Sequence, residues 1–268
     1  MTLLDGKRLL ITGVVTTDSI AFATAAAALA QGAEIVLTSF ERDRDKAVQA
    51  AADLGVPVDV LDLDVTDPLA FDRLAAELRD RWGHLDGALH AVAFAPRAAL
   101  AGDFLDCDPA AATQAFHTSA HSYASLAKVV ADLAPPSGGS IVGLDFDAAG
   151  AWPVYNWMGV CKAALEAVNR YAARDLGVAG VRSNLVAAGP LHTRAAGGIP
   201  EFDRLTSAWD ARSPMRWDVH DPTPVADAVC FLLSDLSRAI TGEILHVDGG
   251  YHAMAAALDR PWNDARAV

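Results

Sequence analysis

The sequence predicts a single α/β domain: a Rossmann-type, doubly wound parallel sheet flanked by helices. Three observations support this fold class. Apolar segments of strand length alternate with segments of helix length along the chain. The chain has 268 residues, of which 52% are hydrophobic and 21% charged, so it can bury one large core. The segments that contain candidate binding or catalytic residues follow the carboxyl ends of the expected strands, which is where doubly wound sheets bind ligands.

Each expected element has its own local signal. Seven short apolar runs have the length of strands. We expect strands at residues 8–12, 34–40, 56–63, 85–94, 140–144, 181–187 and 243–247. Helical periodicity, glycines after helix ends and a proline in one first turn indicate the helices. We expect helices at residues 20–31, 43–54, 68–81, 109–133, 155–176 and 223–233. Their alternation predicts right-handed crossovers between parallel strands.

Composition limits the partners and the compartment. The net charge of −13 argues against nucleic acid or an anionic membrane, because both require clustered basic residues. The sequence contains neither a leader peptide pattern nor about 20 consecutive apolar residues, so we expect a cytoplasmic protein. Residues 1–256 are the expected single domain. Residues 257–268 are polar and lack an apolar period, which predicts a surface tail.

Cysteine and histidine are not arranged as metal ligands. Cys107, Cys161 and Cys230 lie far apart without a C-x-x-C pair, which is typical of small core residues in a reducing compartment. His117 and His121 are one helical turn apart, but no third ligand accompanies them. We therefore expect no metal.

The turn after the first strand has the features of a phosphate site. From Gly13 to Ala21 it has the form G-x5-S-x-A, so the literal G-x-G-x-x-G fingerprint is not present. Gly13 permits a sharp turn, and Ser19 can cap the helix and donate its hydroxyl to a phosphate. The helix N-terminus itself attracts phosphate. An ordinary helix cap is the alternative.

A second stretch carries Tyr155 and Lys162, seven residues apart. On a helix this separation is nearly two turns, so both would share one face about 10 Å apart. Met158 stands four residues before Lys162, and no serine or threonine occurs between Ser140 and Ser183. Ketone-reducing short-chain dehydrogenases instead use Tyr-x3-Lys with a preceding serine. The alternative is an amphipathic tyrosine and a solvated lysine.

Several motifs together resemble the enoyl-acyl carrier protein reductases, particularly the actinobacterial type, over nearly the whole chain. Besides the Gly13 turn and the Tyr-x6-Lys spacing, they are residues 61–65, 122–128, 145–147, 155–158, 183–190 and 247–250. The resemblance implies a short-chain dehydrogenase/reductase that uses NADH to reduce the trans-2 double bond of enoyl thioesters in fatty acid biosynthesis. The thioester would be carried by acyl carrier protein or coenzyme A. It also implies a homotetramer.

The resemblance assigns residues to three roles. The catalytic set would be Tyr155, Lys162 and Phe146, with Tyr155 stabilising the enolate oxygen and Lys162 binding the ribose hydroxyls. The cofactor would contact Gly13, Ser19, Ile20, Phe40, Asp64, Val65, Ala91, Val92, Ala93, Lys162, Gly189, Pro190, Leu191 and Thr193. The substrate would contact Phe94, Met158, Tyr155, Ala195 and Ile199. Val65 and Leu191 could instead be core residues.

Two features leave cofactor use open. Ala91 and Ala93 stand where the family usually has Ser-x-Gly, and the lost hydroxyl would cost about 1 kcal/mol, or roughly fivefold in affinity. The second strand ends at Phe40 without a basic residue, which favours NADH. Arg42 and Arg44 follow closely, so NADPH stays an alternative.

Residues 193–214 are the expected substrate lid. We expect an irregular region with Gly197 and Gly198 as a hinge. The lid is shorter than in mycobacterial members of the family, which favours shorter acyl chains. Its arginines could receive an acidic carrier protein or be an ordinary solvated surface. Trp152 and Trp157 could be apolar walls of the site or core residues.

Three other functions stay open to different degrees. The missing serine argues against a ketone reductase. A paralogous enoyl reductase of secondary metabolism fits the same motifs. A cofactor-binding regulator that has lost turnover is motivated by Ala91 and Ala93.

Overall fold

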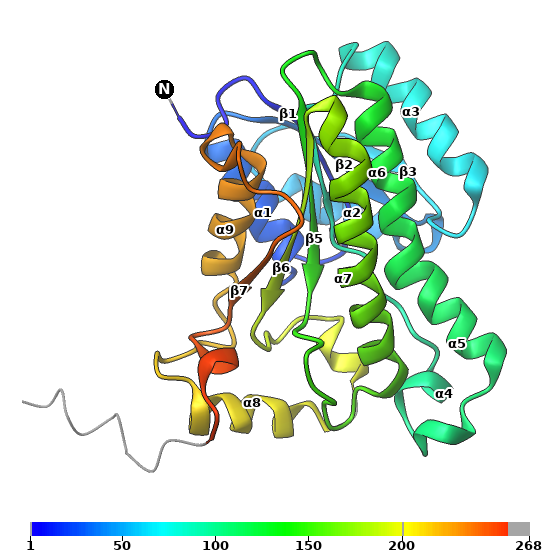
Figure 1. The fold of residues 1–268 in the computed structure, drawn as a ribbon. Coiled ribbons are helices and arrows are strands. Elements are labelled where there is room, and N and C mark those ends of the chain that lie inside the picture. Colours follow the sequence, from blue (N-terminus) through cyan, green and yellow to red (C-terminus); the bar gives the residue numbers. More distant parts are fainter. Residues whose placement is uncertain (1, 200, 257–268) are drawn as a thin grey trace, which may run out of the picture.

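The computed structural model describes residues 2–199 and 201–256. Its centre is one parallel seven-stranded sheet with the order β3-β2-β1-β4-β5-β6-β7 (Figure 1). The strands are β1 (Arg8–Ile11), β2 (Glu34–Ser39), β3 (Val60–Asp62), β4 (Gly87–His90), β5 (Gly139–Asp145), β6 (Val181–Ala188) and β7 (Ile244–Val247). The chain runs outward from β1 in one direction and then from β4 in the other. This confirms the doubly wound fold.

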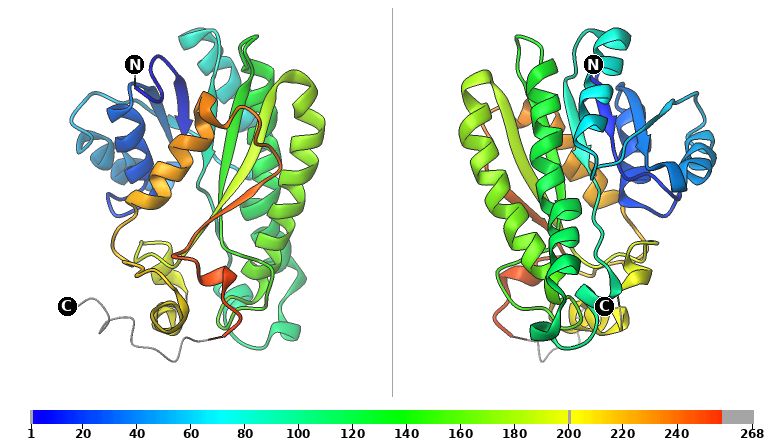
Figure 2. Two further views of the ribbon diagram at one scale, coloured as in Figure 1. Left: turned by 60° about the vertical axis from the view of Figure 1, so that its left-hand side comes forward. Right: turned by 90° about the vertical axis from the view of Figure 1, so that its right-hand side faces the viewer.

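Helices cover both faces of the sheet (Figure 2). The helices are α1 (Ile20–Ala30), α2 (Arg44–Ala52), α3 (Pro68–Trp82), α4 (Arg97–Leu100), α5 (Pro109–Phe116), α6 (Ser122–Leu133), α7 (Asn156–Leu176), α8 (Phe202–Arg212) and α9 (Thr223–Leu233). One apolar core joins the sheet to α1, α2 and α9, and the other joins it to α3, α6 and α7. Leu9 and Ile11 of β1 enter the first core and Leu10 enters the second. Their alternation follows from the period of a strand.

Four expected elements differ from the structure. The strand expected at 56–63 is shorter and spans only Val60–Asp62. The helix expected at 109–133 is interrupted by a π-helical turn at His117–His121. The strand expected at 85–94 ends at His90, because the following residues leave the sheet. The lid at 193–214, expected to be irregular, contains α8, which lies across the end of the sheet toward which β5 and β6 point (Figure 1).

A buried polar network connects α6, α7 and β6. The Tyr123 hydroxyl lies 2.8 Å from Ser183 Oγ, and that hydroxyl donates to Asn169 Oδ1 at 2.8 Å. Asn169 Nδ2 donates to the carbonyl of Glu243, which precedes β7. These side chains are fully buried, so each bond avoids the cost of an unpaired polar group.

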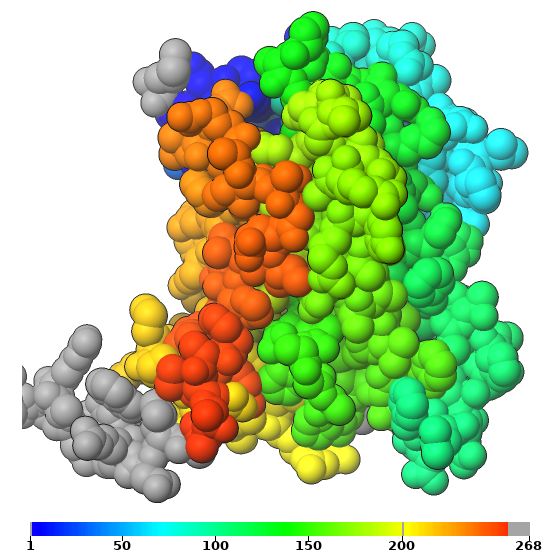
Figure 3. Space-filling model, viewed as in Figure 1, coloured from blue at the N-terminus to red at the C-terminus, as the bar shows by residue number. Residues whose placement is uncertain are grey.

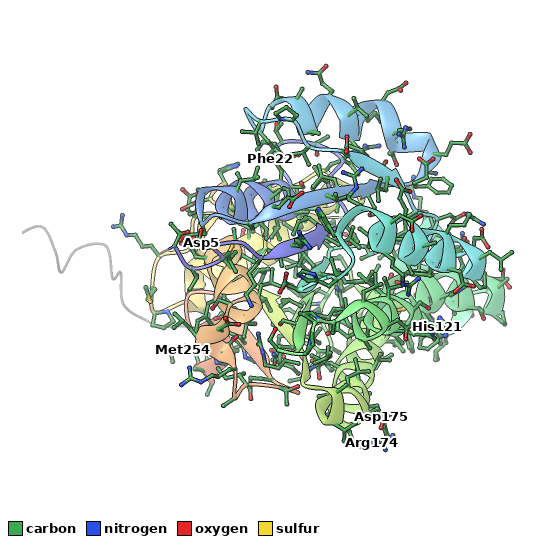
Figure 4. All side chains as sticks on the ribbon, turned by 90° about the horizontal axis from the view of Figure 1, so that it is seen from above. Asp5, Phe22, His121, Arg174, Asp175 and Met254 are labelled. Carbon is green, nitrogen blue, oxygen red and sulfur yellow. The ribbon has the colours of Figure 1, made fainter. Side chains whose placement is uncertain are left out.

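Two surface segments can be located in the figures. In the space-filling view, residues 251–253, drawn in red, lie beside α8 (Figure 3). Arg174 and Asp175, which pair with each other, project outward at the far end of α7 (Figure 4). No helix among the described residues is long and apolar enough to cross a bilayer. The tail expected at 257–268 lies outside the described residues.

Candidate active site

Two adjoining cavities open at the carboxyl ends of the strands. Their volumes are about 790 and 270 Å³. Ala91 after β4, Leu144 of β5 and Thr193 after β6 line both of them. Gly13, which follows β1, lines the smaller cavity. The strand order reverses between β1 and β4, so the cavities lie at the switch point where doubly wound sheets bind dinucleotides.

The smaller cavity has the features of a phosphate cradle. Gly13 has a φ of 82°, and a Cβ there would lie 2.1 Å from the carbonyl oxygen of Ala91, so only glycine fits. Ser19 caps α1: its hydroxyl accepts from Phe22 N and donates to the carbonyl of Thr16. The hydroxyl hydrogen is therefore already engaged. The first backbone N–H groups of α1, beginning at Ile20, are the better donors for a phosphate.

Tyr155 is held at the start of α7. It is the N-cap residue, so the helix begins one residue later than expected. Its neighbours Val154 and Asn156 have φ values of 59° and 34°, a backbone region that is rare for residues other than glycine. The ring packs against Phe146 at a centroid distance of 5.1 Å. Burial, followed by the nearby Asp145, raises the pKa of Tyr155, so its phenol is protonated at neutral pH.

Lys162 faces the larger cavity from the next turns of α7. It is buried, and its Nζ donates to the carbonyl of Leu144 at 2.8 Å. The solvated-lysine alternative is therefore wrong. Burial lowers the pKa of Lys162, and the charge of Asp145 opposes this shift. An ammonium group has three N–H donors, so two remain for other acceptors.

Asp145 is a site residue that sequence reasoning missed. It ends β5, lines the larger cavity and is 5% exposed. Within residues 2–199 and 201–256, neither of its carboxyl oxygens has a hydrogen-bond partner. Burial raises the pKa of Asp145 to about 7, although Lys162 acts in the opposite direction. Its place in the 145–147 motif was the only signal in the sequence.

The rest of the larger cavity is mainly apolar. It is lined by the expected substrate residues Phe94, Tyr155, Met158, Ala195 and Ile199. The helices α4 and α8 add Leu100, Phe202 and Leu205, which the sequence analysis did not include. Its buried polar lining residues are Asp145, Tyr155 and Lys162, whereas Arg97 is exposed.

The two tryptophans of the 145–157 stretch lie outside both cavities. Trp152 packs behind Phe146, at a centroid distance of 4.9 Å, and also against Trp209 of α8. Trp157 stacks on Phe104 and donates to its carbonyl oxygen. Both side chains pack against the apolar cluster that includes Tyr155 and Met158.

The helix α8 is attached to the sheet through Trp209. This side chain is 2% exposed, stacks on Tyr251 at 3.8 Å and donates to the carbonyl of Asp248. A Cβ on Gly189 would lie 2.8 Å from Trp209 Nε1, so glycine is needed in this loop. The second half of the expected lid is thus packed against the loop that follows β7, and the mobility of the lid stays a prediction.

Most expected cofactor residues line the two cavities, and three do not. The residues that do are Gly13, Ser19, Ile20, Ala91, Val92, Ala93, Lys162, Gly189, Pro190, Leu191 and Thr193. Phe40 is exposed at the end of β2, under the guanidinium of Arg42. Asp64 accepts from the backbone and hydroxyl of Thr66, and Val65 packs partly against the core. The adenine contacts of these three residues stay predictions.

The glycine cradle, the switch-point cavity and the buried Tyr155–Lys162 pair together define a dinucleotide-binding oxidoreductase of the short-chain dehydrogenase/reductase class. No group of three or more potential metal ligands occurs in the described part of the chain. The family model described as Enoyl-(Acyl carrier protein) reductase matches residues 13–252. The chain therefore belongs to the enoyl-acyl carrier protein reductase family.

Three relatives illustrate this membership. An enoyl-[acyl-carrier-protein] reductase [NADH] of Mycolicibacterium smegmatis is 46% identical, over 92% of this chain and 97% of the relative. The enzyme of the same name from Mycobacterium avium is 44% identical, over 92% and 97%. The Escherichia coli K12 enzyme is 38% identical, over 95% of this chain and 97% of its own length.

Proposed function

We propose that the protein reduces the trans-2 double bond of enoyl thioesters with NADH, in fatty acid biosynthesis. The observation that carries this proposal is the buried Tyr155–Lys162 pair at one wall of a cavity that is otherwise mainly apolar. An acyl chain suits the apolar part, and a polar reacting group suits the end at Tyr155. The relatives bear names that specify the same reaction.

The smaller cavity and the part of the larger cavity at Lys162 together fit a dinucleotide. The Gly13 turn leaves room for a diphosphate beside the first N–H groups of α1. Lys162, with one N–H on Leu144, can present its other two to ribose hydroxyls. When bound there, NADH supplies the hydride that C3 of the enoyl thioester receives.

Tyr155 then stabilises the charge that develops on the substrate. Hydride addition at C3 places negative charge on the thioester oxygen, and a protonated phenol is the donor that this oxygen needs. The raised pKa of Tyr155 keeps that proton on the phenol before the reaction. Phe146 packs on the tyrosine ring and limits its movement.

The region beside Phe40 supports NADH over NADPH. Both arginines near the end of β2 already have partners. The guanidinium of Arg42 lies 5.4 Å from the Phe40 ring centre and its Nε is 3.6 Å from Asp43, and Arg44 pairs with Asp62. A ribose 2′-phosphate would have to compete with these carboxylates.

The partners and the location are inferred from the family. The names of the relatives include acyl carrier protein, so we infer a carrier-bound thioester as substrate, with a coenzyme A thioester as the alternative. We also infer a cytoplasmic homotetramer. Sedimentation equilibrium would measure the assembly, and a stable monomer would contradict that inference.

Replacement of Tyr155 by phenylalanine tests the proposed role. The loss of a hydrogen bond to a charged oxygen is worth roughly 1.5–3 kcal/mol, so kcat should fall about 10- to 150-fold. NADH affinity should stay nearly unchanged, since Lys162 remains. In contrast, Lys162→Ala should weaken NADH binding.

The matched control is Tyr171→Phe, on the same helix. Tyr171 is 62% exposed, so its loss should leave both constants unchanged. A Tyr155→Phe enzyme that turns over enoyl thioester as fast as the parent would remove Tyr155 from the mechanism.

A further inference from the structure

Buried polar atoms without a partner gather beside Lys162. In the described residues, the buried side-chain atoms without hydrogen bonds are His90 Nδ1, both carboxyl oxygens of Asp145, and Arg212 Nε. Three of these four atoms belong to residues at the carboxyl ends of the neighbouring strands β4 and β5. Buried polar atoms without a hydrogen bond lower the stability of the fold, so their presence beside Lys162 indicates that these residues have a functional role.

His90 is neutral and donates through its Nε2–H. Its Nε2 lies 2.8 Å from Ser122 Oγ, and that hydroxyl donates to the carbonyl of Thr118 at 2.6 Å. Ser122 must then accept from Nε2–H, which leaves Nδ1 as an unprotonated acceptor. Burial and the charge of Lys162 lower the pKa of His90 to about 3. His90 therefore adds no charge near Lys162.

Among the described titratable groups around Lys162, only Asp145 supplies a negative charge that acts on its ammonium group. Burial raises the pKa values of Tyr155 and Cys161, so both are neutral at pH 7. Glu166 and Asp147 act on Asp145 and raise its pKa further. Glu166 accepts from the backbone of Ala148, and Asp147 from that of Ala149. The carboxylate of Asp145 is thus the negative charge that acts on Lys162 from β5.

We propose that Asp145 is a positioning residue: its buried carboxylate keeps Lys162 protonated and so sets the pH range in which this lysine can bind the cofactor. This inference rests on the proposed function and adds a determinant of pH to it. Lys162 Nζ donates to the backbone carbonyl of Leu144, the residue directly before Asp145, and makes no direct ion pair with the Asp145 carboxylate. Asp145 therefore acts on the cofactor only through the charge state of Lys162.

The direction of the pH effect follows from the two groups. Asp145 has a pKa of about 7, so it is mostly neutral at acidic pH and mostly charged at alkaline pH. Burial lowers the pKa of Lys162, and a charged Asp145 raises it. Removal of the carboxylate should therefore have little effect at acidic pH, where Asp145 of the parent is itself mostly neutral. As the pH rises, Lys162 of the variant should lose its proton at a lower pH than Lys162 of the parent.

The experiment compares NADH affinity of the parent and Asp145→Asn across pH, by fluorescence titration without substrate. Each unit by which the pKa of Lys162 falls changes its protonated fraction by up to tenfold, so we expect NADH binding to weaken by several-fold, and by up to about tenfold, near pH 8.5 and by less than twofold near pH 6. The isosteric amide keeps the volume of the side chain. Asp145→Ser removes the same charge with a smaller side chain and should show the same trend.

The matched control is Asp175→Asn, on the same helix as Lys162. The Asp175 side chain is 62% exposed and pairs with Arg174 at the far end of α7, so the titration curve of this variant should follow that of the parent. A loss of affinity in Asp145→Asn that is equal at both pH values would mean a packing role and overturn the proposal, as would no loss at either. The proposed function fails by a different result, namely no reduction of enoyl thioesters by a parent protein that binds NADH.

Discussion

Replacing Trp209 with alanine removes the side chain that joins α8 to the carboxyl end of the sheet. Trp209 is 2% exposed, and its ring stacks on Tyr251 and packs against Trp152. Truncation of a buried tryptophan costs about 3–5 kcal/mol, and the hydrogen bond to the Asp248 carbonyl adds about 1 kcal/mol. We therefore expect a loss of roughly 4–6 kcal/mol in the free energy of unfolding.

Urea unfolding measures this loss, and thermal unfolding gives a second reading. For a chain of this size 1 kcal/mol corresponds to roughly 2–4 °C, so the midpoint should fall by roughly 8–24 °C. The KM for enoyl thioester should rise as well, because Phe202 and Leu205 of α8 line the cavity. Trp157→Ala is the control, since this half-buried ring lies outside the cavity. If the two variants lose equal stability, α8 is not anchored through Trp209.

Two further predictions concern single positions. Gly13→Ala should destabilise the fold by at least about 2 kcal/mol and abolish NADH binding, because its Cβ would meet the Ala91 carbonyl. Gly55→Ala, with a similar φ of 76° but open space, is the control, and equal effects in both would refute the clash. Ser183→Ala should cost about 1–3 kcal/mol in urea unfolding, since it leaves the Tyr123 and Asn169 side chains without their shared partner. The exposed Ser207→Ala should cost nothing, and an unchanged Ser183→Ala protein would contradict the network.

The strands, most helices and the cofactor turn were predictable because local patterns specify them. Apolar runs and helix signals indicate each element without knowledge of the others. The alternation of strand and helix predicts a doubly wound sheet, and in the structure Gly13 and Lys162 line two adjoining cavities that share Ala91. Every substrate residue that the resemblance implied lines the larger cavity.

The parts that were missed depend on tertiary packing or on weaker signals. The helix α8 had a readable pattern, since Phe202, Leu205 and Trp209 recur at helical spacing. The glycines before it favoured an irregular lid instead. The π-helical turn at His117–His121 has no local signature comparable to a proline or a glycine.

The role of Asp145 could not be predicted from the sequence, for a different reason. An aspartate at the end of a strand reads as a polar loop residue, and only the packed structure buries it beside Lys162. A pKa shift arises from burial and neighbouring charges, and neither is visible in a single sequence. The adenine contacts expected for Phe40, Asp64 and Val65 stay predictions.

The central claim is conjugate reduction of an enoyl thioester. Its most direct test follows NADH oxidation by absorbance with crotonyl and dodecenoyl thioesters in parallel, with a ketoacyl thioester as the control. The account predicts oxidation with both enoyl substrates, none with the ketoacyl thioester, and much slower turnover with NADPH. Turnover of the ketoacyl thioester without turnover of the enoyl substrates would contradict it.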